Sequence, residues 1–213
     1  MRVKPAVDRD GLDAALDRAR AGDETGFLEL WKSLQPPLLR YLRVRTTDGG
    51  EDVAAETWLQ VVRDLRGFRG DATDFRAWLF TVARNRSVDA ARARSARPVV
   101  LVADLHAIGT GPTADSAELQ ALERLSTRDA LELVASLPAE QAEMVVLRVV
   151  AGLDVPVVAG IVGKSPGAVR VSVHRGLRTL SRDPRTRALP DEAQPLPDEA
   201  HPSGASESPV EVV

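Results

Sequence analysis

Cysteine is absent from the 213 residues of this sequence, and histidine occurs only three times. Without cysteine the chain can form neither disulfides nor thiolate zinc sites, which suits a reducing compartment. The histidines, at positions 106, 174 and 201, stand far apart and suggest no shared metal site. We therefore expect no metal and no cofactor.

Long apolar runs are missing as well. No stretch approaches the roughly 18 apolar residues that span a bilayer, and the first residues are charged rather than signal-like. Hydrophobic residues make up 44% of the chain and charged residues 28%, as in ordinary soluble proteins. These features predict a cytoplasmic protein without membrane insertion.

Alternating strand patterns are also lacking, whereas apolar residues recur at helical spacing in most of the chain. The pattern predicts an all-α fold in which Pro36 and Pro37 kink or split one long helix and Trp78 lies in the core. Helices are expected at about residues 12–21, 24–45, 51–65, 74–95, 118–136 and 138–151, followed by a helix pair at 154–180.

Helical periodicity fades between residues 98 and 117, where strong helix formers are few and glycine and proline recur. The sequence therefore predicts two small helical domains joined by a flexible linker. The expected bounds are 1–97 for the first domain, 98–127 for the linker, 128–185 for the second domain and 186–213 for a disordered, acidic, proline-rich tail.

The net charge of −3 conceals an uneven distribution. Residues 84–97 contain five arginines and one acid, and residues 164–187 contain seven basic residues and one acid. Residues 188–213 hold six acids and neither lysine nor arginine. Two basic islands in an overall acidic chain predict contact with a polyanion at two places.

Residues 154–180 have the pattern of a helix-turn-helix. Asp154 can cap a short first helix, Gly163 can end it in a left-handed conformation, and Ser165 can cap a second helix. The apolar face of that second helix is expected to consist of Val169, Val173, Leu177 and Leu180.

The opposite face of the second helix is cationic. Its expected DNA-contacting residues are Arg170, Val171, His174, Arg175 and Arg178, with Lys164 in the preceding turn. A helix that is apolar on one side and cationic on the other, held by such a turn, is typical of a major-groove reader. A solvated amphipathic helix is the alternative, because a basic stripe alone does not specify DNA.

Asp52 and Glu56 lie four residues apart in the expected helix 51–65 and therefore share one face. Paired carboxylates can form an acid–base or metal site, but no further convergent polar group accompanies them, so we expect no enzyme activity. A solvated acidic face and a protein-docking surface are the other interpretations.

Phe68 lies in the loop 67–71, outside any helical register. It can act as a hydrophobic staple onto the following helix, or its ring can stack on an extruded nucleotide base. In the following helix Arg84, Asn85 and Arg92 interrupt the apolar stripe, and such side chains hold phosphates and base edges.

Two long segments carry a family resemblance. The first segment resembles region 2 of the extracytoplasmic-function (ECF) group of bacterial RNA polymerase sigma factors. It reads GGEDVAAETWLQVVRDLRGFRGDATDFRAWLFTVARNRSVDAARAR and looks actinobacterial. The second segment resembles region 4 of the same group and reads LPAEQAEMVVLRVVAGLDVPVVAGIVGKSPGAVRVSVHRGLRTL. With the opening AGDETGFLELW, the likeness covers roughly residues 12–97 and 128–182.

The resemblance implies a sigma factor that directs core RNA polymerase to specific promoters and aids melting of the −10 element. Asp52 and Glu56 would dock on the clamp helices of the polymerase β′ subunit. Contact with the −10 element would fall to Phe68, Arg84, Asn85 and Arg92, and contact with the −35 element to the residues of the helix-turn-helix. The polymerase β flap and an anti-sigma factor are further expected partners, and a stand-alone helix-turn-helix regulator is the alternative function.

Overall fold

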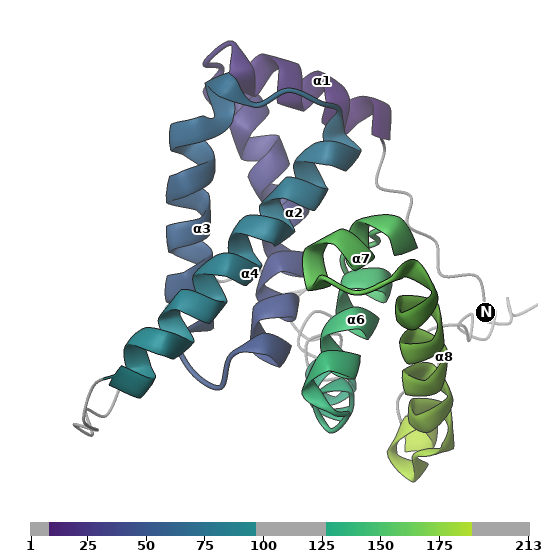
Figure 1. Ribbon diagram of the computed structural model, residues 1–213. Helices are drawn as coiled ribbons and strands as arrows, with labels where there is room; N and C mark the ends of the chain where they lie inside the picture. The colour runs from purple at the N-terminus through teal and green to yellow at the C-terminus, as the bar shows by residue number, and fades with distance from the viewer. Residues whose placement is uncertain (1–8, 97–126, 189–213) are drawn as a thin grey trace, which may run out of the picture.

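The computed structural model describes residues 9–96 and 127–188 (Figure 1). Within these ranges the backbone forms α-helices and two short 3-10 segments, with no strand. The expected all-α fold is therefore confirmed. The expected linker and tail lie almost entirely outside the described ranges.

The N-terminal unit contains four α-helices and a 3-10 turn. Their bounds are α1 (Arg9–Arg20), α2 (Glu24–Arg45), α3 (Gly50–Asp64), η1 (Leu65–Gly67) and α4 (Ala72–Ala96). The carboxylate of Asp23 caps α2 by accepting the Thr25 N–H at 2.9 Å. Of the two effects expected of Pro36 and Pro37, a kink or a split, the split is wrong, because α2 continues through both prolines.

The core of this unit is built from side chains that repeat at helical spacing. Tyr41, Phe75 and Phe80 are fully buried, and the Tyr41 and Phe80 rings meet edge to face at 5.5 Å. Trp58 donates its indole N–H to Gln35 at 2.6 Å, which satisfies its polar atom in a largely apolar setting. Trp78 was expected in the core but is half-buried.

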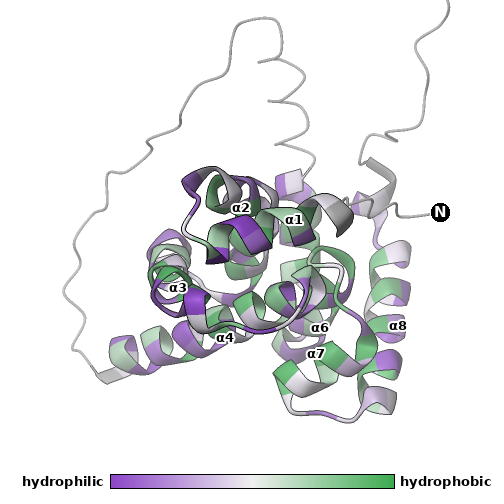
Figure 2. Cartoon of the chain, turned by 90° about the horizontal axis from the view of Figure 1, so that it is seen from above, coloured by the Kyte–Doolittle hydropathy of each residue, from purple (hydrophilic) through white to green (hydrophobic). Residues whose placement is uncertain are grey.

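The C-terminal unit begins with helical residues 127–135 and continues through α6 (Ala139–Val149), α7 (Val155–Val162), α8 (Pro166–Arg182) and η2 (Pro184–Ala188). Helix α6 packs against both α7 and α8. Viewed from above, α8 lies at the edge of the molecule and carries hydrophilic residues along its length (Figure 2). None of the helices in the described ranges has the length and apolarity needed to cross a bilayer.

The two units pack against each other, which the sequence pattern did not predict. Helix α6 lies against α2, and α7 lies against α4 (Figure 1). Met144, Leu147 and Leu153 of the C-terminal unit belong to the same buried apolar cluster as the core of the N-terminal unit. The surfaces available for a ligand are therefore those that remain outside this shared core.

Candidate nucleic-acid interface

The helix-turn-helix forms as expected at both ends of its turn. Gly163 ends α7 with φ +68°, in the left-handed region that glycine adopts without a steric penalty. The Ser165 hydroxyl then caps α8 by accepting the Ala168 N–H at 3.2 Å. Asp154 occupies the capping position of α7, but its side chain accepts no capping hydrogen bond. These ends fix the position of α8 relative to α7.

Helix α8 packs on α6 through a face that differs from the expected one at one position. Val169 is fully buried and Val173 half-buried, but Leu177 is 43% exposed. Gly176 takes the expected place of Leu177: a Cβ atom added there would lie 2.7 Å from Cγ2 of Val145. The two helices approach so closely at this point that any side chain at residue 176 would force a neighbour on α6 to move.

The outer face of α8 presents the residues that the sequence assigned to DNA. All of them are exposed: Arg170, Val171, His174, Arg175 and Arg178. Val171 is 49% exposed, which leaves an apolar contact surface between the cationic side chains. Lys164 is also exposed, and its ammonium group pairs with Glu140 at 3.1 Å. This face combines hydrogen-bond donors with an apolar surface, and both kinds of group are used in readout of the major groove.

Phe68 packs in an aromatic group at the start of α4. Its ring stacks on Trp78 at 5.1 Å and meets Phe75 edge to face at 5.5 Å. The Arg20 guanidinium lies over the Phe68 ring, 5.2 Å from its centroid. These contacts agree with the staple interpretation.

The same ring also lines an open pocket of about 480 Å³. Its other lining residues are Arg63, Asp64, Gly67 and Trp78. A half-buried phenylalanine and tryptophan beside an arginine provide stacking surface and positive charge for a nucleobase. Sequence reasoning missed Trp78 and Arg63 here, because only the tertiary fold brings them to Phe68.

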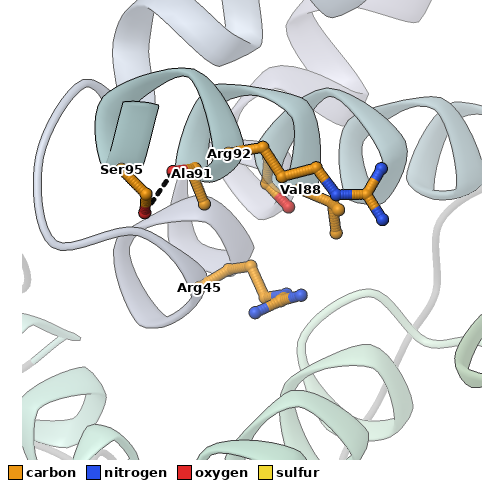
Figure 3. A pocket seen from close by; sticks show the side chains of 6 residues that line it. Arg45, Val88, Ala91, Arg92 and Ser95 are labelled. Carbon is orange, nitrogen blue, oxygen red and sulfur yellow. Dashed lines mark hydrogen bonds between the residues drawn. The ribbon is translucent and has the colours of Figure 1, made fainter. Parts of the chain in front are cut away.

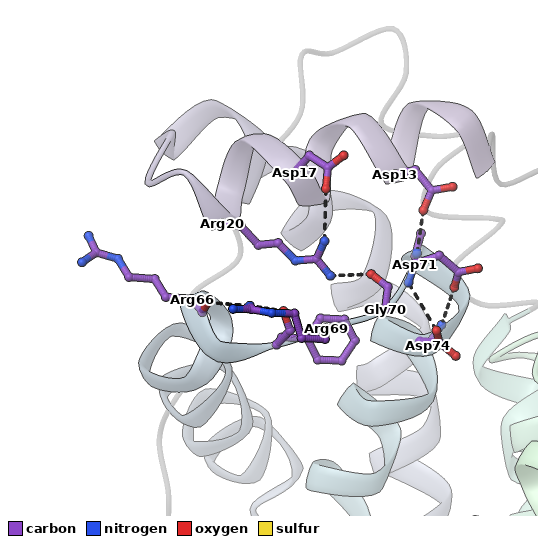
Figure 4. A network of polar contacts seen from close by, with 10 residues as sticks. Asp13, Asp17, Arg20, Arg66, Arg69, Gly70, Asp71 and Asp74 are labelled. Atoms are coloured by element: carbon purple, nitrogen blue, oxygen red, sulfur yellow. Dashed lines mark hydrogen bonds and ion pairs between the residues drawn. The ribbon is translucent and has the colours of Figure 1, made fainter.

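Polar contacts hold the loop before α4 in place (Figure 4). Arg20 reaches from α1 and donates to the carbonyl oxygen of Gly70, and it pairs with Asp17 at 3.1 Å. The Asp71 carboxylate accepts the Asp74 N–H at 2.9 Å, and Asp74 accepts the Asp71 N–H at 3.3 Å. This reciprocal arrangement is a capping box, so the loop is preorganised.

The three polar residues assigned to DNA on α4 do not share one environment. Asn85 and Arg92 are exposed. Arg84 is half-buried, and its Nε donates to Oε1 of Glu143 on α6 at 3.0 Å. The structure thus leaves Asn85 and Arg92 available to a ligand, while Arg84 is engaged between the two units.

The acidic residues of α3 lie on the surface together with two apolar ones. Asp52 and Glu56 are exposed, and so are Leu59 (66%) and Val62 (54%). Leu59 continues the face of Asp52 and Glu56 at helical spacing, a signal that the sequence contained. An acidic face with exposed leucine and valine is better suited to docking a protein than to solvation alone. In the described residues, no group of three or more acidic or histidine side chains could hold a metal ion.

Comparison with known protein families gives two matches. Residues 30–97 match Sigma-70 region 2, and residues 127–180 match Sigma-70, region 4. The first contains the Phe68 loop and the whole of α4, and the second contains the helix-turn-helix.

Two similar proteins come from actinobacteria. The ECF RNA polymerase sigma factor BldN of Streptomyces coelicolor is 33% identical over 194 residues, covering 89% of this chain and 71% of BldN. The ECF RNA polymerase sigma factor SigD of Mycobacterium tuberculosis is 32% identical over 191 residues, covering 84% of this chain and 88% of SigD.

Solved structures share the fold. CnrH in complex with the cytosolic domain of CnrY gives a TM-score of 0.53 at 23% identity, covering 81% of this chain and 96% of the CnrH chain. The sigma factor RpoE in complex with the anti-sigma factor NepR, from Bartonella quintana, gives 0.51 at 20% identity, covering 73% of this chain and 94% of the other. At these identities the likeness establishes the fold alone.

Proposed function

Because this chain belongs to the ECF group of RNA polymerase sigma factors, which direct core RNA polymerase to specific promoters, we propose how its surfaces divide that task. The helix-turn-helix reads the −35 duplex, the Phe68 pocket and α4 hold the melted −10 strand, and α3 docks on the polymerase. The stand-alone regulator is not favoured, since such a protein has no need for a region 2 beside its helix-turn-helix.

The observation that best supports −35 reading is the solvent-facing arrangement of α8. Arg170, Val171 and Arg175 are exposed on the side away from the buried Val169. Because α8 is held by the Ser165 cap and by the close approach at Gly176, its outer residues can enter a groove without rearrangement. Phosphates flanking the groove would be held by the exposed Arg178 and Lys164.

The −10 element would be held on the N-terminal unit. A base extruded from the stack can lie against Phe68 and Trp78 in the pocket that Arg63 also lines. Asn85, exposed on α4, can contact a base edge, and Arg92 can contact a phosphate. The loop carrying Phe68 is preorganised by its capping box, which lowers the cost of ordering it around a single strand.

Docking on the polymerase is proposed for the exposed face of α3. Asp52 and Glu56 would meet basic residues of the β′ clamp helices, and Leu59 would pack against an apolar neighbour. The C-terminal unit would meet the β flap. An anti-sigma factor, expected from the family resemblance, is proposed as a further partner. The chain would act in the cytoplasm and would have no active site of its own.

Substitution of the α8 arginines tests the assignment to the −35 element. In polymerase holoenzyme, Arg170→Ala and Arg175→Ala should each weaken promoter binding by ~1–3 kcal/mol, and the loss should depend on the base at one position of the element. Arg182→Ala is the matched control, because Arg182 is exposed on the last turn of the same helix. If the loss is equal for all −35 sequences, the substituted arginine contacts a phosphate and does not read a base.

A further inference from the structure

Glu143 is a buried acid on α6, the helix that packs on α2, and it is only 7% exposed. Three groups of the N-terminal unit surround its Oε1 atom. The Tyr41 hydroxyl donates at 2.9 Å, the Nε of Arg84 donates at 3.0 Å, and the Nε of Arg45 lies 3.2 Å away. One carboxylate of the C-terminal unit thus joins two cations of the other unit.

The groups around Glu143 form an anion site that belongs entirely to the N-terminal unit. Arg45 and Arg84 together carry two positive charges against one negative charge, and each side chain is 27% exposed. Burial, reinforced by the charge of Glu143, raises the pKa of the Tyr41 hydroxyl, so this group stays protonated and remains a donor. Without an acceptor the buried hydroxyl would be unsatisfied and the two cations uncompensated. In the closed packing the site therefore favours an anion.

An open pocket of about 530 Å³ extends the site along α4. It is lined by Arg45, Ser87, Val88, Ala91, Arg92 and Ser95 (Figure 3). Arg45 projects from α2 beneath α4, which carries Arg92 with its side chain 79% exposed. A second cation that lines the same open pocket fits an extended polyanion better than a small ion, because successive phosphates of a strand need successive positive groups.

We propose that Tyr41, Arg45 and Arg84 bind a backbone phosphate of single-stranded DNA, and that Glu143 occupies this phosphate site when the two units are closed. The proposal rests on the proposed assignment of α4 to promoter DNA. A strand reaches the site only after α6 has withdrawn, so closure lowers the apparent affinity of the free chain in proportion to its open fraction. Glu143 is then an internal competitor of DNA.

Binding of a fluorescent oligothymidine of about 20 nucleotides to the full chain tests this competition. Glu143→Gln keeps the shape of the side chain but removes its charge, and it should bind roughly tenfold more tightly. The slope of log affinity against log salt should become steeper by about 0.7 for each additional phosphate that the chain neutralises. Adding Arg45→Ala to Glu143→Gln should abolish both the tighter binding and the steeper slope.

Glu132→Gln is the matched control. Glu132 is an exposed glutamate of the same unit that pairs with Arg128 at 3.0 Å, so its substitution removes the same charge away from the boundary between the units. Its affinity for the oligothymidine should stay close to that of the wild type. Equal affinity and equal salt dependence of Glu143→Gln and wild type would overturn the proposal.

Opening of the chain gives a second readout that leaves Glu143 in place. Because the sequence has no cysteine, Glu51→Cys on α3 and Arg182→Cys on α8, both exposed positions, can carry one pair of spin labels. We expect the oligothymidine to shift the distance between the labels to longer values, and binding without such a shift would overturn the proposal. Failure of the wild-type holoenzyme to start transcription would contradict the proposed function instead, so the two failures are distinguishable.

Discussion

Asn85 and Phe68 are both assigned to the −10 element, but they differ in what surrounds them. Asn85 is exposed on α4, whereas Phe68 stacks on Trp78 and lies beneath Arg20. Substitution of Asn85 should therefore affect recognition alone. Substitution of Phe68 should affect both recognition and the packing of the loop.

We predict that Asn85→Ala leaves thermal stability and polymerase binding unchanged and reduces formation of the open promoter complex. The reason is that its side chain faces solvent and lies on a different helix from the acidic docking face of α3. Fluorescence of a base analogue placed in the −10 element measures promoter opening. Thr47→Ala, which replaces an uncharged and exposed residue between α2 and α3, is the control. Normal opening by Asn85→Ala would remove this residue from the −10 contact.

At the residue scale, the sequence predicted exposure correctly where it depends on the local element. The five residues assigned to DNA on α8 are all exposed, because helical spacing places them away from the buried Val169, and Lys164 is exposed in the preceding turn. The surroundings of Phe68 could not be predicted in the same way. Arg20 reaches its ring from α1 and Trp78 reaches it from α4. No periodicity within the loop predicts either contact.

At the scale of elements, helix bounds follow closely from capping and breaking residues. Helix α2 spans the residues expected, since Asp23 caps its start. The sequence predicted less well which residues of α8 are buried against α6. Hydrophobicity favoured Leu177 for the buried face, but the distance between α6 and α8 is set by steric fit, and Gly176 allows the closer approach.

We predict that Gly176→Ala lowers the free energy of unfolding by about 1–3 kcal/mol, because the added Cβ would lie 2.7 Å from Val145 Cγ2 and 3.1 Å from Gln141 Cγ. Gly167→Ala is the matched control. Gly167 lies in the same helix with no atom near its Cβ position, so alanine there should stabilise by about 0.5–1 kcal/mol. Urea unfolding curves measure both, and equal effects would show that the α6–α8 contact is not tight.

At the scale of the whole molecule, the sequence predicted two helical units but not their contact. The groups that join the units are far apart in the chain: Tyr41 and Glu143 are separated by 102 positions, and Arg84 and Glu143 by 59. Helical periodicity describes neighbours within one element and carries no information on such pairs. The packing of α6 on α2 is therefore a result of the tertiary structure alone.

Tyr41 reports on this contact, because it is the single tyrosine of the chain. Burial raises its pKa, so in the closed form the phenol should not ionise near its ordinary pKa of about 10. Since the pKa of the folded state is raised, the stabilising contribution is fully present below pH about 10 and is lost only as pH rises through the higher value. Absorbance of tyrosinate during alkaline titration measures this, and ionisation of the native chain with a midpoint near 10 would contradict the closed packing.

The central claim, that this chain gives core RNA polymerase its choice of promoter, is tested most directly by mapping transcription start sites. Core polymerase from an actinobacterium would transcribe genomic DNA of the source organism with and without the chain. The account predicts new start sites that depend on the chain and share one −10 and one −35 motif, with the −35 preference altered by Arg175→Ala. Absence of new start sites, together with tight binding of the chain alone to duplex DNA, would contradict it.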